Sequence, residues 1–272
     1  RPLAVFDACP SPPLKWSRLT SQSLIDCARA GIPSELISMG MTGAACLCAQ
    51  AAMRSGSGLV VCGIPESLND IMEVKLTEVM TLPLAETRHR ALSSEAADKI
   101  LDIARSCDVV ALGPGLGTEK PVKDLIRSVL KGAEVPVVLD ADGLNALEGD
   151  MDFIKKRPFS TVITPHPGEM STLTGIDTTC IQADRTGMAR MVSERTGAVV
   201  CLKGHKTVVT SPDGATYVND TGNSGMASGG SGDVLTGMIA SFIGQGIDVY
   251  SASVSAVYLH GMAGDIAADK KG

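Results

Sequence analysis

The chain has 272 residues, which is enough for one domain or for one domain with a small lid. Hydrophobic residues make up 44% of the chain and aromatic residues only 3%, so the sequence predicts a large core of aliphatic side chains and alanine. The net charge of −6 argues against nucleic acid or an anionic membrane as a partner, but it does not exclude small anionic ligands.

Two further features narrow the class of protein. No apolar run reaches the roughly 18 residues that a transmembrane helix needs, and residues 1–13 lack the apolar core of a signal peptide. The cysteines form no C-x-x-C pair and no cluster with histidine at metal-ligand spacing. Several lie in or beside apolar runs, which predicts buried, reduced thiols and a cytoplasmic protein; these are Cys46, Cys62, Cys107 and Cys201.

Apolar patterning predicts helices alternating with short strands from residue 40 onward. Before that point, prolines interrupt the chain and only a short helix at 21–30 is expected. Expected helices lie at residues 42–55, 93–105, 122–130, 182–195 and 249–268, and expected strands at 59–62, 109–112, 136–139, 161–163 and 198–202. Residues 208–210 and 216–218 are expected to form a hairpin around an S-P-D-G turn. The alternation predicts an α/β fold with a mainly parallel sheet covered on both faces.

The most informative stretch is residues 219–244, NDTGNSGMASGGSGDVLTGMIASFIG. Its glycine-rich first half leads into an apolar stripe with helical spacing, so a helix is expected to begin near Ser231 and Gly232. Unpaired N–H groups and the helix dipole at such an end bind phosphate or an oxyanion. Asp233 in the first turn either only satisfies the helix end or serves as a base beside a bound phosphate. No Lys-Ser/Thr pair follows the glycines, so the loop is not a P-loop.

Four consecutive expected strands end in short motifs, and ligands of such sheets bind at the carboxyl ends of the strands. GPGLG (113–117) does not have the spacing of a dinucleotide-binding fingerprint. DADGLN (140–145) supplies Asp140 and Asp142, which either start a helix or help to hold Mg²⁺ through water.

The other two motifs are PHPGE (165–169) and KGHKT (203–207). Two prolines stiffen the backbone around His166, and we expect its imidazole to hydrogen-bond a substrate. Glu169 either caps the following helix or reaches a hydrated metal. Lys203 ends an apolar strand, so we expect its ammonium to point into the crevice, where it suits a nucleotide phosphate; the alternative is a surface lysine. His89, His205 and His260 have no comparable setting.

Taken together, the motifs resemble the ADP/ATP-dependent NAD(P)H-hydrate dehydratases of the ribokinase-like superfamily. The glycine loop with GSGD is shared by the whole superfamily, whereas PHPGE, KGxxT and NxTGNxGMA are more specific to the dehydratases. The resemblance implies a three-layer α/β/α fold. The resembling stretches are, in order, GMTGAA (40–45), ALGPGLG (111–117), VLDADGLNAL (138–147), ITPHPGE (163–169), LKGHKTVV (202–209), residues 219–240 and YLHGMAGDIAA (258–268).

The resemblance implies a repair reaction on NADHX and NADPHX, which are NADH and NADPH hydrated at C6 of the nicotinamide ring. The C6 hydroxyl of the S-form would be phosphorylated by ADP or ATP with Mg²⁺, and phosphate would then leave to regenerate NAD(P)H. With ADP as the donor, the product is AMP.

Site residues carry over from the family one by one. Asp233 would take the proton of the hydroxyl, and Gly230, Ser231 and Gly232 would form the anion hole. The hydrate would contact Ala44, Gly115, His166 and Asp233. The adenine nucleotide would contact Lys203, Gly204, His205, Lys206, Thr207, Asn223 and Gly232. Glu169 and Asp140 are the metal candidates, through water.

The resemblance also implies a homotetramer, and we expect one ribokinase-like domain over residues 1–272 with no epimerase domain. The sequence departs from the family's usual pattern in two places. IPSELISM (32–39) occupies the place of the family's first strand and its glycine-rich turn, so residues 1–39 are an unmatched segment. The sequence also stops at Gly272, before the family's usual closing helical segment, and a truncated chain would account for this.

Two alternative functions stay open at this point. A kinase of the same fold, acting on a hydroxymethylpyrimidine, a thiazole alcohol or a sugar, would keep Asp233 and the glycine loop but would not need a cleft long enough for a dinucleotide. A non-catalytic module that senses the NAD(P) or adenylate pool would tolerate loss of the Asp233 carboxylate.

Overall fold

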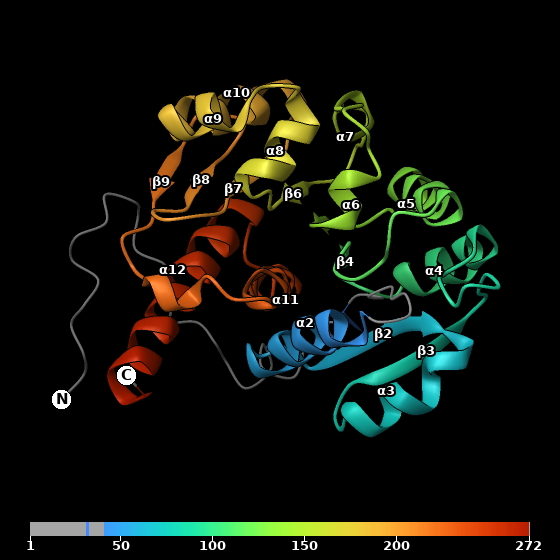
Figure 1. The fold of residues 1–272 in the computed structure, drawn as a ribbon. Coiled ribbons are helices and arrows are strands. Elements are labelled where there is room, and N and C mark those ends of the chain that lie inside the picture. The colour runs from blue at the N-terminus through green and yellow to red at the C-terminus, as the bar shows by residue number, and fades with distance from the viewer. Residues whose placement is uncertain (1–30, 33–40, 272) are drawn as a thin grey trace.

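Figure 1 shows the computed structural model, which describes residues 31–32 and 41–271. The helix expected at 21–30 lies outside the described residues. Within them, the strands form two sheets. The smaller sheet is parallel, in the order β1 (Gly31–Ile32), β2 (Leu59–Pro65) and β3 (Met80–Leu84). The larger sheet has the order β4 (Val110–Leu112), β5 (Val137–Leu139), β6 (Thr161–Ile163), β7 (Val199–Leu202), β8 (Val208–Thr210) and β9 (Thr216–Val218).

In the larger sheet β4 to β7 are parallel, and β8 and β9 form the expected antiparallel hairpin. The sheet is therefore mainly parallel, as predicted. The helices are α2 (Thr42–Arg54), α3 (Asn69–Lys75), α4 (Ala97–Ala104), α5 (Lys120–Gly132), α6 (Asp142–Asn145), α7 (Asp152–Lys155), α8 (Pro167–Thr174), α9 (Thr178–Ala183), α10 (Arg185–Thr196), α11 (Ser231–Gly244) and α12 (Val249–Lys271).

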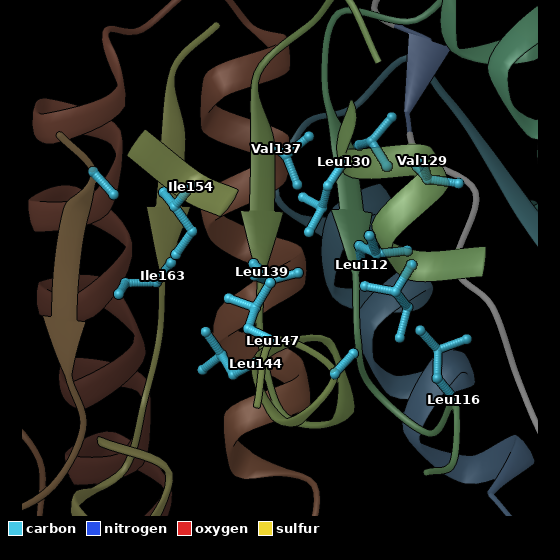
Figure 2. Close-up of a cluster of buried hydrophobic side chains, with 14 of the residues drawn as sticks. Leu112, Leu116, Val129, Leu130, Val137, Leu139, Leu144, Leu147, Ile154 and Ile163 are labelled. Carbon is cyan, nitrogen blue, oxygen red and sulfur yellow. The ribbon is translucent and has the colours of Figure 1, made fainter. Parts of the chain in front are cut away.

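Alternate residues of the central strands point to opposite faces of the sheet, and both faces are buried. On one face Leu112, Leu139 and Ile163 pack with the leucines and valines of α5 and its neighbours, as Figure 2 shows. On the other face Ala111 and Val138 pack with α2, α11 and α12. In Figure 1 the red α11 and α12 lie on one side of the larger sheet and the green and yellow helices on the other. This is the expected three-layer α/β/α arrangement.

The structure divides two of the expected helices. Residues 182–195 belong to two helices, because Asp184 leaves the helical conformation (φ −140, ψ 73) and its side chain accepts a hydrogen bond from the N–H of Gly187 at 2.8 Å. Residues 93–105 begin with a 3₁₀ turn, Ser94–Ala96, before α4. The sequence did not predict β3 or α3.

Cys46, Cys62, Cys107 and Cys201 are buried, as expected. Burial raises the pKa of the Cys201 thiol to about 12, so this thiol is inert at neutral pH. None of the helices in the described part of the chain has the length and apolar character needed to cross a bilayer.

A glycine allows α2 and α11 to pack in direct backbone contact. A Cβ added at Gly237 of α11 would lie 2.1 Å from the carbonyl oxygen of Cys48 on α2. No such atom fits without moving one helix away from the other. The contact fixes the position of α11, and with it the glycine loop that precedes this helix.

We predict that Gly237→Ala lowers the free energy of unfolding by about 2 kcal/mol, because the new methyl group overpacks a backbone contact. Gly43→Ala is the matched control, since Gly43 is also helical but has no heavy atom within 4 Å of its added Cβ. The control is expected to change stability by less than about 1 kcal/mol. Urea unfolding of the two variants measures both values, and equal stabilities would contradict the prediction.

Candidate functional site

Helix α11 begins where the sequence predicts, directly after Gly230. Gly230 is the N-cap residue and has φ 92 and ψ −16, a left-handed conformation that glycine adopts without strain. Within the described residues, no side chain caps this end of the helix. The N–H groups of the first turn, including that of Gly232, are therefore placed to bind an anion.

A cavity of about 760 Å³ lies beside this helix end. Its walls come from the loop after β7, the loop after β9, the start of α11 and part of α12. The volume is in the range of small-molecule sites. All seven residues expected to bind the nucleotide line it, and Ser231 and His166 line it too. The seven are Lys203, Gly204, His205, Lys206, Thr207, Asn223 and Gly232.

Lys203 points into this site rather than along the surface, and its side chain is only 18% exposed. Its ammonium lies 2.5 Å from Oδ1 of Asp140 and 3.6 Å from Oε2 of Glu169. Burial alone would lower the pKa of Lys203, but the two carboxylates outweigh burial and the pKa is raised. Lys203 is therefore a permanent positive charge at the edge of the cavity.

Asp233 lies in the first turn of α11 and is half-buried. Burial raises the pKa of its carboxyl, and the negative charge of Asp140 raises it further, while Lys203 acts in the opposite direction. A carboxylate with a raised pKa accepts a proton more readily than an ordinary aspartate does. Asp233 therefore lies in the same helix turn as the uncapped N–H groups.

Ala44 and Gly115, both expected to contact the hydrate, are neighbours in the structure. A Cβ added at Gly115 would lie 3.3 Å from the Cβ of Ala44. One turn further along α2, Leu47 packs on Gly230, because a Cβ there would lie 2.4 Å from Leu47 Cδ1. The start of α2 therefore meets both the glycine loop after β4 and the start of α11.

His166 and Glu169 form a capping box at the start of α8. Nδ1 of His166 accepts hydrogen bonds from the N–H groups of Gly168 at 3.0 Å and Glu169 at 3.2 Å. Oε2 of Glu169 accepts from the N–H of His166 at 2.8 Å. Of the two roles that the sequence left open for Glu169, the structure shows capping. Because Nδ1 is an acceptor, a neutral His166 ring carries its proton on Nε2.

The metal candidates do not fit direct ligation of Mg²⁺. Oδ1 of Asp140 binds Lys203, its Oδ2 accepts from the hydroxyl of Thr236 at 2.7 Å, and the same ammonium is near Glu169. A cation is repelled by an ammonium in that position. Asp142 begins α6 and accepts from the N–H of Gly117 at 2.8 Å, which is its structural alternative. In the described part of the chain no cluster of three or more His, Cys, Asp or Glu side chains is suited to hold a metal.

The sequence analysis places Asn223, in the loop after β9, in the site, but it does not predict that α12 holds this loop in position. The Asp265 carboxylate of α12 accepts from the N–H of Gly222 at 2.8 Å and from Nδ2 of Asn223 at 3.0 Å. His260, which was left unassigned, lines the cavity and has Nε2 3.5 Å from Oγ of Ser231. Burial lowers the pKa of His260. A sequence pattern could have indicated this role of α12, because His260, Gly261, Gly264 and Asp265 have helical spacing and lie on one face of the last expected helix.

Comparison with known proteins shows which protein family the chain is similar to. The model of the NAD(P)H-hydrate dehydratase family matches residues 37–272. The bifunctional NAD(P)H-hydrate repair enzyme of Moorella thermoacetica is 46% identical over 86% of the chain, and the chain spans 44% of the length of that relative. The ADP-dependent (S)-NAD(P)H-hydrate dehydratase of Neisseria meningitidis serogroup B is 38% identical, with 86% of the chain and 76% of the relative covered.

A solved structure agrees with the fold. The ADP/ATP-dependent NAD(P)H-hydrate dehydratase from Bacillus subtilis, co-crystallised with ATP and Mg²⁺, is 30% identical with a TM-score of 0.75. The similarity covers 97% of this chain and 87% of that one.

We predict that His166→Ala lowers the free energy of unfolding by about 1 kcal/mol, because it removes the N-cap of α8. His166→Asn is the matched control, since asparagine is a strong N-cap and should keep wild-type stability. Urea unfolding compares the two variants, and a fully stable alanine variant would refute the capping role. A ligand-binding defect that remains in His166→Asn then belongs to the imidazole ring itself.

Proposed function

The chain belongs to the NAD(P)H-hydrate dehydratase family, and on this basis we propose that it dehydrates the S-form of hydrated NADH and NADPH with an adenine nucleotide as phosphoryl donor. ADP is the proposed donor and AMP the product. The small-alcohol kinase and the non-catalytic module are less favoured, because the matched family is a dehydratase family over residues 37–272.

One observation carries the proposal. All seven residues expected to hold the nucleotide line one cavity, and this cavity reaches the start of α11, where Asp233 stands in the first turn. A phosphoryl group bound at this helix end would be within reach of a carboxylate with a raised pKa. A binding module has no need of such a base.

In the proposed reaction, the hydrate lies against Ala44, Gly115, His166 and Asp233. Asp233 takes the proton of the C6 hydroxyl, and the hydroxyl oxygen attacks the terminal phosphorus of ADP. The bond from that phosphorus to the bridging oxygen breaks and AMP leaves. The phosphate then departs from C6 with its bonding electrons, the neighbouring ring carbon C5 loses a proton to solvent, and the C5–C6 double bond of NAD(P)H is restored.

The start of α11 supplies the electrostatic part of the proposed mechanism. In the proposal, the N–H groups of Gly230, Ser231 and Gly232 form an anion hole for the charge that develops on the transferred phosphoryl group. The N–H of Ser231 is directed to the carbonyl oxygen of Ser228, at 3.4 Å, in the structure. Lys203 adds a fixed positive charge, since its raised pKa keeps the ammonium protonated. Because these groups belong to a helix end and to a buried ion pair, we propose that ligand binding requires little reorganisation.

Mg²⁺ is proposed to enter with the nucleotide, because it prefers phosphate oxygens and several waters to a cage of protein ligands. Asp140 and Glu169 do not fit direct ligation, and no step is assigned to a metal held by them. Contact with the hydrated ion through water stays a prediction for these two carboxylates.

The assembly and the location of the protein are also proposals. We propose one ribokinase-like domain over residues 1–272, whose first 39 residues lack the family's motifs, although the family model itself begins at residue 37. We also propose a homotetramer and a cytoplasmic location. The proposed partners are NADHX or NADPHX and an adenine nucleotide, without nucleic acid or membrane.

The activity is tested by the absorbance at 340 nm after the protein is added to prepared NADHX with Mg²⁺ and either ADP or ATP. We expect a rise that requires nucleotide and is faster with ADP, because reduced nicotinamide absorbs there and the hydrate does not. No rise with either nucleotide, from folded protein that binds ADP, would reject the dehydratase and direct the search to small alcohols.

Asp233→Asn tests the base. We expect turnover to fall by about a thousand-fold, because general-base catalysis typically contributes between a hundred- and ten-thousand-fold. ADP binding, measured by calorimetry, should change only a few-fold. Asp142→Asn is the control for lost charge, since Asp142 also acts electrostatically on Asp233 but binds the N–H of Gly117. Comparable losses in both variants would mean that Asp233 acts only through its charge.

A further inference from the structure

The carboxylate of Asp140 is buried and bound at both oxygens. It is 1% exposed, Oδ1 accepts from Nζ of Lys203 at 2.5 Å, and Oδ2 accepts from Oγ1 of Thr236 at 2.7 Å. A buried charge is stable only when its charge and its lone pairs are matched. Asp140, Lys203 and Thr236 therefore form one unit, which we call the Asp140 bridge.

The bridge holds an ammonium over the first turn of α11. A Cβ added at Gly232 would lie 3.4 Å from Nζ of Lys203 and 3.9 Å from Oδ2 of Asp140. Thr236 lies four residues after Gly232 on the same helix face. Because Thr236 belongs to α11, the bridge fixes the position of the Lys203 ammonium relative to the N–H groups at the start of α11.

The backbone around Asp140 is built to orient this carboxylate. Ala141 has φ 46 and ψ −118, a conformation that costs energy for a residue with a side chain. Its neighbour Asp142 is directed to the N–H of Gly117. A Cβ added at Gly113 would lie 1.7 Å from the carbonyl oxygen of Asp140, so only glycine allows this approach. The strained residue, Ala141, therefore lies between two aspartates whose carboxylates bind different partners.

We propose that Asp140 is a positioning residue, which with Thr236 holds the Lys203 ammonium in register with the first-turn N–H groups of α11, so that both engage the terminal phosphate of the adenine nucleotide. This inference rests on the proposed nucleotide site. It assigns Asp140 to a lysine rather than to a metal, so the effect of the bridge does not depend on Mg²⁺.

The test is the ratio of the dissociation constants of AMP and ADP, measured by titration calorimetry first in EDTA and then in Mg²⁺. The two nucleotides differ only in the terminal phosphate, so the ratio reports contacts to that group. Thr236→Val removes the hydroxyl without changing charge or size, and the preference for ADP should fall roughly five-fold in EDTA, the equivalent of one hydrogen bond. Thr236→Ser keeps the hydroxyl and should restore the wild-type ratio. The affinity for AMP should be the same in all three proteins.

Asp140→Asn is a second variant, in case Thr236→Val does not fold. Without the Asp140 charge, Lys203 turns toward Glu169, and the preference for ADP should again fall in EDTA. A loss that appears only with Mg²⁺ would make Asp140 a metal ligand and overturn the proposal, as would a wild-type ratio in Thr236→Val. Wild-type protein that binds neither nucleotide would instead overturn the proposed function.

Discussion

The ion pair between Lys203 and Asp140 joins the ends of two strands that are not neighbours in the sheet. Asp140 follows β5 and Lys203 follows β7, and β6 lies between these strands in the sheet. The N–H of Lys203 donates to the carbonyl of Pro165 after β6, so the ends of three strands are tied together. Thr236 extends the connection to α11. Because an unpaired buried charge is costly, this edge of the sheet must assemble as a unit.

Negative charge outnumbers positive charge at this edge. Asp140, Glu169 and Asp233 all act electrostatically on Lys203, and burial raises the pKa of both Glu169 and Asp233. The proposed nucleotide would add further negative charge to this group. The N–H groups of α11 carry no acid or base chemistry of their own, so they attract phosphate at every pH. The helix end therefore supplies the attraction that the side chains alone do not.

The sequence predicted what depends on local pattern and failed where distant residues decide. The strands β4 to β7 were placed within about a residue because each is a short, continuous apolar run between turn residues. β3 contains Pro83 and is only partly buried, so it lacks that pattern. Motif resemblance grouped the seven residues proposed to bind nucleotide, and these do line one cavity. The partners of Asp140 lie 63 and 96 positions away, and no local signal identifies them. The capping role of His166 was missed for a different reason: its partners are only two and three residues away, but histidine is not among the residues usually expected at an N-cap.

Two glycines of α12 allow the loop after β9, which lines the cavity, to pack directly on this helix. A Cβ added at Gly261 would lie 2.1 Å from Oγ1 of Thr221, and one added at Gly264 would lie 2.3 Å from Sδ of Met226. The loop after β9 rests directly on this bare strip of helix. In a mutational scan of the whole chain, these two glycines would tolerate as few substitutions as the residues that bind ligand. Intolerance to substitution at these positions of α12 would therefore reflect close packing between the helix and the loop. It would not identify residues that contact ligand or take part in catalysis.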